Sequence, residues 1–313
     1  MHILYIQTYT VYAQYLQICV HWGGISMNSL LEVKGLCKKL DGFSLENISF
    51  ELKPGYIMGL IGVNGSGKTT LLHTILNLYQ PDSGSVTVSG YPMENQDTEA
   101  KARIGAVLEK DFFEEEWTVK KNGRVYGAFY SDFSLSVFLQ ACSRFEVPPE
   151  RKVKELSKGT RRKMQFAFAL SHNPLLYFMD EPADGLDPGF RRSLLSCMQE
   201  IVESGERSVI FSTHLTEDLD KVADYILLIH EGKILFCLDK ESLYSRFRLV
   251  KGAKEELMAL PDKWVVGMEH KAYHSEALIF LTEENRSRFG QLPAPKLASI
   301  FYYCERGKDS CGN

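Results

Sequence analysis

Residues 62–69 are GVNGSGKT, and they lie between the apolar runs YIMGLI at 56–61 and LLHTIL at 71–76. The spacing fits G-x-x-x-x-G-K-[ST], a glycine-rich loop between a strand and a helix that binds phosphates. Glycine lets successive main-chain N–H groups turn inward, and the following helix presents its positive dipole end to the same anion. Lys68 would reach the β- and γ-phosphates, and the Thr69 hydroxyl would ligate Mg²⁺. The stretch therefore predicts a nucleotide site; a glycine-rich turn that binds nothing is the alternative.

The composition is that of an ordinary globular protein. The chain has 313 residues, 44% hydrophobic and 24% charged, which allows one large domain, or a domain of about 200 residues with a small appendage. The net charge of -4 argues against a protein that mainly grips nucleic acid, which needs clustered surplus Lys and Arg. The seven cysteines are scattered singly, which favours reduced thiols in the cytoplasm. No run of about 18 apolar residues is present, so a membrane role would require a partner.

The first 27 residues differ from the rest of the chain. They are aromatic, contain no Lys, Arg, Asp or Glu, and are interrupted by Gln7, Gln14 and Gln17. A signal peptide would begin with basic residues and end at a cleavage site with small residues. We interpret residues 1–27 as a segment upstream of the true start at Met27, or as a disordered extension.

The chain after residue 28 predicts short strands and a βα core. Alternating or continuous apolar residues predict strands at 31–34, 45–52, 56–61, 85–88 and 104–108. A helix is expected at 69–79, and mostly helical structure at 118–150. Residues 110–117 combine aromatic and acidic side chains. A solvated loop is the simpler interpretation of this segment, and a partner surface is the alternative.

A second group of motifs begins with the segment LSKGT at 156–160, which precedes a helix expected at 161–171. On its own, Ser157 predicts only a helix N-cap. The apolar run at 175–179 ends in two carboxylates, Asp180 and Glu181, at the carboxyl end of a buried strand, where ligand sites of α/β proteins form.

Those two carboxylates suit the chemistry of a nucleotide triphosphate. Asp180 can hold Mg²⁺ through water, and Glu181 can orient and deprotonate an attacking water. Two solvated turn acids are the alternative interpretation. Farther along, a buried strand expected at 208–213 ends at His214, which can donate to the γ-phosphate there or be an ordinary surface histidine.

Together these motifs resemble the ATP-binding subunits of ABC transporters over residues 30–240. In that likeness the Walker A motif is 62–69, the signature segment 156–160, the Walker B motif 175–180 and the D-loop 184–187. The closer likeness is to ATPases of bacterial ABC-2-type exporters, the bacitracin-resistance group. The resemblance implies an α/β fold: a P-loop NTPase core of the ABC ATPase type with an antiparallel β subdomain and a helical subdomain at about 110–172.

The resemblance also implies the site residues. Contacts to ATP are expected from Gly62, Asn64, Gly65, Ser66, Gly67, Lys68, Thr69, Thr70, Ser157, Gly159 and Phe43. Ligands of Mg²⁺ are expected to be Thr69, Asp180 and Glu109. The catalytic groups are expected to be Glu181 as base, His214 as switch histidine and Lys68.

Four positions depart from the family pattern. The usual Leu-Ser-Gly-Gly-Gln is here LSKGT, so Lys158 and Thr160 do not carry over as ATP contacts. Glu109 replaces a glutamine, which keeps an oxygen but loses an amide donor and adds charge. Leu40 lies where a base-stacking tyrosine is common, and Phe43 is the nearest ring.

The resemblance implies an assembly as well. One chain carries both halves of the site, so a head-to-tail homodimer holding two ATP molecules follows. A separate transmembrane permease is the expected partner, with the chain in the cytoplasm at the inner face of the membrane. We expect the permease to dock in a groove behind Glu109 lined by Phe112, Phe113 and Trp117. The alternatives are a soluble ABC ATPase that acts on ribosomes or DNA, and a regulatory subunit that binds ATP with weak turnover.

The expected domain organisation is an ATPase domain at 28–240 and a small α/β accessory domain at 241–313. Within the latter, apolar stretches predict strands at 264–266 and 277–281, and a closing helix at 296–303. No residue pattern there indicates chemistry. A packing role is therefore favoured over a role in regulation or dimerisation.

Overall fold

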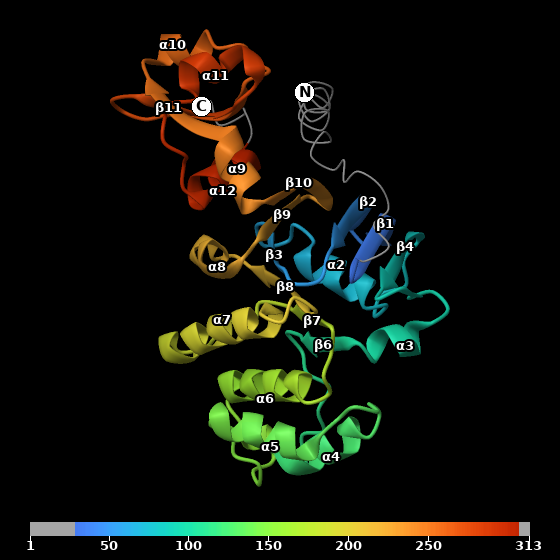
Figure 1. Ribbon diagram of the computed structural model, residues 1–313. Helices are drawn as coiled ribbons and strands as arrows, with labels where there is room; N and C mark the ends of the chain where they lie inside the picture. Colours follow the sequence, from blue (N-terminus) through green and yellow to red (C-terminus); the bar gives the residue numbers. More distant parts are fainter. Residues whose placement is uncertain (1–28, 307–313) are drawn as a thin grey trace. The chain divides into compact units, whose positions relative to one another are not determined.

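A computed structural model describes residues 29–306 (Figure 1). The prediction for residues 1–27 lies outside the described residues. The contacts divide the described chain into two compact units, residues 29–234 and residues 235–306. Among these residues, no helix has the length and apolar character needed to cross a membrane.

The first unit is built around a six-stranded sheet with the order β10-β9-β3-β8-β7-β6. The strands are β3 (Ile57–Ile61), β6 (Ile104–Val107), β7 (Leu176–Met179), β8 (Ser208–Thr213), β9 (Tyr225–His230) and β10 (Lys233–Asp239). Strand β3 pairs in parallel with β8 and β9, and β7 pairs in parallel with β6 and β8. Every residue of β3, β7 and β8 is buried, which explains the apolar runs within their sequences. Parallel pairing brings the carboxyl ends of these strands to one edge.

Helices cover this sheet. They are α2 (Lys68–Ile75), α6 (Lys158–Leu170), α7 (Pro188–Val202) and α8 (Thr216–Val222). Helices α7 and α8 pack on β3 and β8, and α6 packs on β6. The start of helix α7 is set by two local features. Asp187 caps its N-terminus by accepting from Phe190 N–H, and Pro188 occupies the first turn.

A second, antiparallel sheet has the order β2-β1-β4-β5. Its strands are β1 (Leu31–Leu40), β2 (Phe43–Leu52), β4 (Ser83–Val88) and β5 (Tyr91–Pro92), with the short helix α3 (Asp97–Lys101) after them. The strands predicted at 31–34, 45–52 and 85–88 are all present, and β1 extends six residues farther than expected. The added length carries β1 to Leu40, opposite Phe43 in the ladder with β2.

The predicted helical insertion comprises α4 (Val119–Gly127), α5 (Leu135–Arg144) and a 3₁₀ turn, η2 (Val153–Glu155), which precede α6. Helices α4, α5 and α6 pack together around Phe168, whose ring neighbours include Phe113 at 5.6 Å and Phe138 at 6.0 Å between centroids. Phe113 is only 5% exposed. The prediction that Phe113 lines an open docking groove was therefore wrong, because its ring belongs to this aromatic core.

The second unit contains the three-stranded antiparallel sheet β11-β13-β12. Its elements are α9 (Lys240–Arg246), β11 (Phe247–Gly252), α10 (Lys254–Met258), β12 (Val265–His270), β13 (Ser275–Phe280), α11 (Glu283–Phe289) and α12 (Leu297–Arg306). The two predicted strands and the closing helix correspond to β12, β13 and α12. One apolar cluster includes Leu257, Ile279 and Phe289. The fold of this unit thus follows the predicted α/β pattern.

A buried carboxylate lies within the second unit. Glu276 on β13 accepts from Tyr303 on α12, with 3.0 Å between the oxygens, and from Lys251 and Lys271 at 2.8 and 2.7 Å. Burial disfavours its charge, but these hydrogen bonds and one from His274 outweigh that effect and hold the pKa of Glu276 well below its usual range. The network ties α12 to the sheet.

Candidate functional site

The phosphate loop joins β3 to α2 and shapes an anion site. Gly67 is the N-cap of α2 with φ +111°, and an added Cβ there would come within 2.5 Å of the Phe43 ring. At Gly62 an added Cβ would lie 2.3 Å from the main-chain oxygen of Ile229. In the described chain, no side chain caps α2 and no acid occupies its first turn. The first N–H groups of the helix therefore remain available to an anion.

The other predicted loop residues differ in exposure. Asn64 and Gly65 are exposed, and Thr69 and Thr70 are half-buried. Ser66 is buried, and its Oγ has no hydrogen-bond partner among the described residues. A buried hydroxyl without a partner is costly, so Ser66 favours a ligand at the loop.

Lys68 lies in the loop and points to the carboxyl edge of the sheet. It is 6% exposed, and its Nζ donates to the main-chain oxygen of Gly62 over 2.8 Å. The same Nζ is 3.9 Å from Oε1 of Glu181. One ammonium group thus contacts both the phosphate loop and the strand end that carries the predicted base.

Asp180 and Glu181 follow β7 and are organised by a residue that sequence reasoning missed, Ser212 on β8. The Ser212 hydroxyl donates to Oδ1 of Asp180 over 2.6 Å and accepts from Glu181 N–H over 2.7 Å. The parallel pairing of Met179 with Phe211 places it there. The only sequence signal was a polar residue near the end of an apolar strand.

The second oxygen of Asp180 is different from the first. Asp180 is 1% exposed, yet Oδ2 has no hydrogen-bond partner among residues 29–306. A buried carboxylate oxygen without a partner suits a cation. Among the described residues, no three His, Cys, Asp or Glu side chains converge on a metal position, so a cation here would need Thr69 and phosphate oxygens as further ligands.

Glu181 and His214 form the exposed side of this edge. Nδ1 of His214 is 3.0 Å from Oε2 of Glu181. Since an ionised carboxylate only accepts, this contact places a proton on Nδ1. Glu181 has φ +44°, a left-handed conformation that is uncommon for a residue with a side chain. The predicted base and switch histidine are therefore in direct contact.

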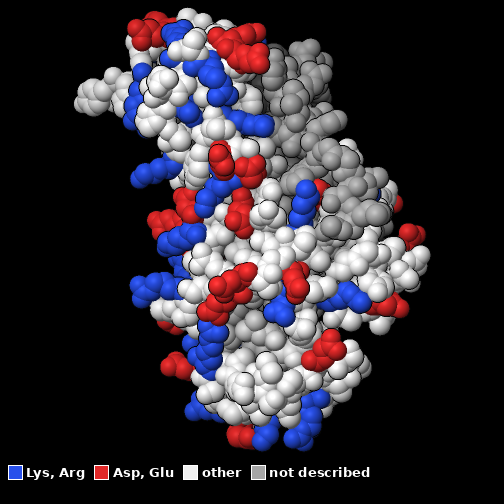
Figure 2. Space-filling model, viewed as in Figure 1, with Lys and Arg blue, Asp and Glu red and all other residues white. Residues whose placement is uncertain are grey.

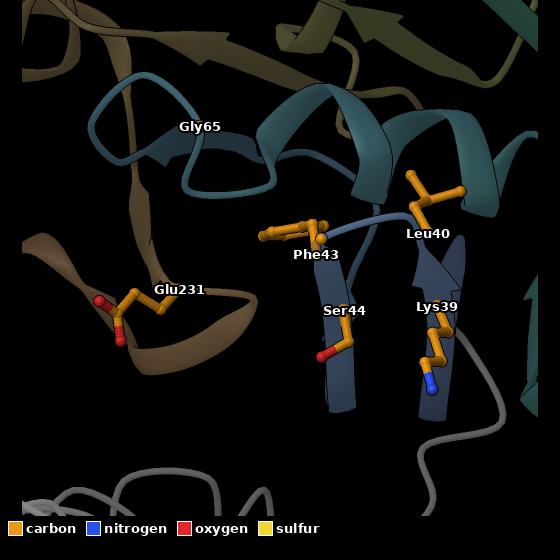
Figure 3. A pocket seen from close by; sticks show the side chains of 7 residues that line it. Lys39, Leu40, Phe43, Ser44, Gly65 and Glu231 are labelled. Atoms are coloured by element: carbon orange, nitrogen blue, oxygen red, sulfur yellow. The ribbon is translucent and has the colours of Figure 1, made fainter. Parts of the chain in front are cut away.

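A cavity of about 500 Å³ lies beside the loop, between the β1–β2 turn and the β9–β10 turn. Leu40, Phe43, Gly65 and Glu231 line it, and Figure 3 shows Phe43 below the loop that carries Gly65, with Glu231 across from it. The Phe43 ring also packs against Gly67. Both residues weighed for base contact, Leu40 and Phe43, are thus next to the phosphate loop.

The signature segment begins α6. Ser157 is its N-cap and accepts from Thr160 N–H over 3.1 Å, which confirms the N-cap prediction. Lys158 donates to Asp184 over 2.9 Å, and this hydrogen bond lowers the pKa of that carboxyl. An added Cβ at Gly159 would lie 3.3 Å from the main-chain oxygen of Gly185. The segment therefore contacts the predicted D-loop, and the contacts described for it include none to the phosphate loop of the same chain.

Glu109 follows β6 and is exposed. On the face shown in Figure 2, acidic and basic side chains are interspersed.

The structure brings together Lys68, Asp180, Glu181 and His214 by direct or shared contacts, and places Glu109 on a neighbouring strand end.

Comparison with known proteins points the same way. The family model described as "ABC transporter" matches residues 45–184. A Nod factor export ATP-binding protein I of Cupriavidus metallidurans is 29% identical over 88% of this chain and 90% of its own length. An uncharacterized ABC transporter ATP-binding protein of Bacillus subtilis, YdbJ, is 30% identical over 84% of this chain and 88% of its own length.

Solved structures agree in fold. An ATP-binding subunit of an ABC transporter has a TM-score of 0.64 and 26% identity over 69% of this chain and 92% of its own. A dimeric ATP-binding cassette in a post-hydrolysis state with ADP and Pi has a TM-score of 0.61 over 67% of this chain and 98% of its own, and at 21% identity it shows the fold alone. The predicted fold is confirmed by these likenesses.

Proposed function

We propose that this chain, which belongs to the ATP-binding proteins of ABC transporters and is an ATPase, drives export through a separate membrane permease. The main observation behind this proposal is the group of contacts at the carboxyl edge of the six-stranded sheet, where the Glu181 carboxylate lies next to the Lys68 ammonium and the His214 ring. The export direction is supported by the name of the Nod factor export relative.

The phosphates of ATP would occupy the loop at residues 62–69. The N–H groups at the start of α2, which no side chain in the described chain caps, and the Ser66 hydroxyl supply donors, and Lys68 supplies positive charge. Asn64, Gly65 and Thr70 complete the loop lining. The base would enter the adjoining cavity and contact Phe43, with Leu40 on the neighbouring strand.

Mg²⁺ fits the donors that remain. Asp180 Oδ2 has no partner among the described residues, and Thr69, with its hydroxyl, lies in the first turn of α2 beside the loop. When bound, the ion would neutralise charge on the phosphate oxygens. Glu109, exposed on the next strand end, is the third proposed ligand, directly or through water.

Glu181 is the proposed general base. Its carboxylate accepts a proton from water as the water oxygen attacks the γ-phosphorus, and the bond from that phosphorus to the β,γ-bridging oxygen breaks to give ADP and phosphate. Ser212 holds the Glu181 main chain, and His214 holds its carboxylate. The His214 ring nitrogen that does not contact Glu181 is the proposed contact to the γ-phosphate.

The signature segment completes the site in a second copy of the chain. Ser157 is exposed and Gly159 is half-buried, and both lie at the N-terminus of α6. We propose that this helix end caps ATP bound to the loop of the partner subunit in a head-to-tail homodimer. Hydrolysis removes the γ-phosphate contacts, so ATP acts as a reversible link that does work on the permease.

The permease would hold the chain at the cytoplasmic face of the membrane. Phe112 is 47% exposed and Phe129 is 81% exposed beside the helical segment, and they are the proposed contact in place of Phe113. The two alternatives predict different results. A non-transport ATPase would be recovered apart from membranes with or without a permease, and a regulatory subunit would release phosphate slowly as a purified dimer.

The Glu181→Gln variant tests the proposed site. We expect ATP turnover to fall by about 100-fold or more while ATP still binds and converts monomers to dimers in size-exclusion chromatography. Glu200→Gln is the matched control, because Glu200 pairs with Arg144 on the surface of α7. Normal turnover in Glu181→Gln, or loss of nucleotide binding with no other change, would refute the assignment.

A further inference from the structure

Arg162 lies on α6, which we call the signature helix because it begins at the signature segment. Its side chain reaches the carboxyl edge of the six-stranded sheet near Asp180 and Glu181, which we call the catalytic edge. It is 3% exposed, although arginine is rarely buried without a carboxylate beside it. One guanidinium nitrogen donates to two main-chain oxygens, that of Leu108 over 2.8 Å and that of Asp180 over 3.0 Å. These oxygens belong to the residues that directly follow β6 and β7. A single side chain therefore joins α6 to two neighbouring strand ends.

The same helix holds the segment around Glu109 at two more points. Gln165, three residues beyond Arg162, accepts from Leu108 N–H over 2.9 Å, so both polar main-chain groups of Leu108 are bound by α6. On the other side of Glu109, the Arg161 Nε donates to Asp111 over 2.9 Å. Leu108 and Asp111, which flank Glu109 on its two sides, are thus both bound to α6.

The charge of Arg162 is matched by the site rather than by one partner. Burial lowers the pKa of Arg162, and the negative charges of Asp184, Asp180, Glu109 and Glu181 oppose that effect. A buried cation among four carboxylates reduces the repulsion among them and costs less than an isolated one. All four belong to the proposed site or its D-loop.

We propose that Arg162 is a positioning residue that couples the signature helix to the catalytic edge of its own subunit, by fixing the main chain beside Glu109 and Glu181. This rests on the proposed function, since α6 then contacts ATP of the partner subunit while Arg162 aligns the base for ATP in its own. When α6 contacts the ATP bound to the partner subunit, Arg162 thereby transmits that contact to the residues of its own subunit that hydrolyse its own ATP.

Arg162→Met tests the coupling, and Lys163→Met is the matched control. Lys163 is the next residue of α6, and its ammonium lies over the Phe190 ring at 4.4 Å, so the control removes the same charge without touching β6 or β7. We expect Arg162→Met to lower kcat on the order of 10- to 100-fold, with the Kd for a fluorescent ATP analogue within about twofold of the parent. Arg162→Lys keeps the charge and one nitrogen donor but on a shorter side chain without the guanidinium group, and we expect partial rescue.

Hydrogen exchange of the nucleotide-free chain gives a second readout. In Arg162→Met, the amides at 104–111 and 176–183 should exchange about tenfold faster, and in Lys163→Met they should not change. Exchange within twofold of the parent in both segments, or an unchanged kcat, overturns the proposal. If Arg162→Met does not fold, the same two measurements, hydrogen exchange and kcat, are made on Arg162→Lys and decide whether the proposal holds. If the parent chain hydrolyses no ATP, the proposed function fails, and exchange alone still decides the role of Arg162.

Discussion

Ser212→Ala should damage both the stability of the sheet edge and ATP hydrolysis. The Ser212 hydroxyl is fully buried and makes two hydrogen bonds, to Oδ1 of Asp180 and from Glu181 N–H. Alanine removes both and leaves a carboxylate oxygen and an amide without partners. The perturbation therefore acts on the two residues proposed to hold Mg²⁺ and to activate water.

The size of the effect follows from these two contacts. A hydrogen bond to a charged group contributes about 1.5–3 kcal/mol, and a neutral one about 0.5–1.5 kcal/mol. The free energy of unfolding should thus fall by about 2–4.5 kcal/mol. A misaligned Glu181 should lower kcat on the order of tenfold or more, equivalent to about 1.4 kcal/mol or more of transition-state stabilisation.

Ser208→Ala separates these effects because Ser208 lies at the other end of the same strand. Ser208 is also fully buried, donates to the Lys53 main-chain oxygen over 2.7 Å and accepts from Tyr56 N–H over 3.3 Å. Urea unfolding should show a loss of stability in both variants, and steady-state phosphate release should show a lower kcat only in Ser212→Ala. Equal kcat values in the two variants would refute the role assigned to Ser212.

Three further predictions follow. Phe43→Ala should weaken ATP binding by about tenfold, and Phe43→Tyr should restore it, as measured with a fluorescent nucleotide; an unchanged Kd removes Phe43 from the base site. A double-mutant cycle of Lys158→Ala and Asp184→Ala should give a coupling energy of no more than about 1 kcal/mol in urea unfolding, since both side chains are exposed, and a larger value contradicts this. Because the pKa of folded Glu276 lies well below its unfolded value, the stability that it contributes is complete above about pH 5 and is lost only as the pH falls toward the folded pKa; Glu276→Gln should speed exchange of the β13 amides at pH 7 and nearly as much at pH 4, and an effect that disappears by pH 4 would contradict the network.

The position of the glycine-rich loop between β3 and α2, and that of the two carboxylates after β7, could be predicted because local spacing determines them. A glycine-rich loop needs only contiguous residues, and a continuous apolar run identifies a buried parallel strand on its own. Strands β3, β7 and β8 therefore lie within one or two residues of their predicted positions. For the same reason, Asp180 and His214 were placed at strand ends before any pairing was known.

Residues that act across strands could not be found in this way. Ser212 reaches Asp180 only through the register of β7 with β8, and Arg162 reaches β6 and β7 only once α6 packs on β6. Phe113 was misjudged for a related reason. The segment at 110–117 combines acidic side chains with aromatic rings, and the sequence does not reveal which rings the helices at 119–144 will cover.

The departures from the family pattern bear on the alternative of weak turnover. Lys158 is bound to Asp184 at the exposed start of α6, whereas the contacts of Glu181 with Ser212 and His214 are made by residues that follow or belong to β7 and β8. Lys158 therefore changes the surface that meets a second subunit, and the groups that activate water are assembled without it. A defect caused by Lys158 should appear as a higher ATP concentration needed for dimer formation, with the kcat of the assembled dimer preserved. A Lys158→Gly variant that dimerises at the same ATP concentration but gains turnover would contradict this separation of assembly from chemistry.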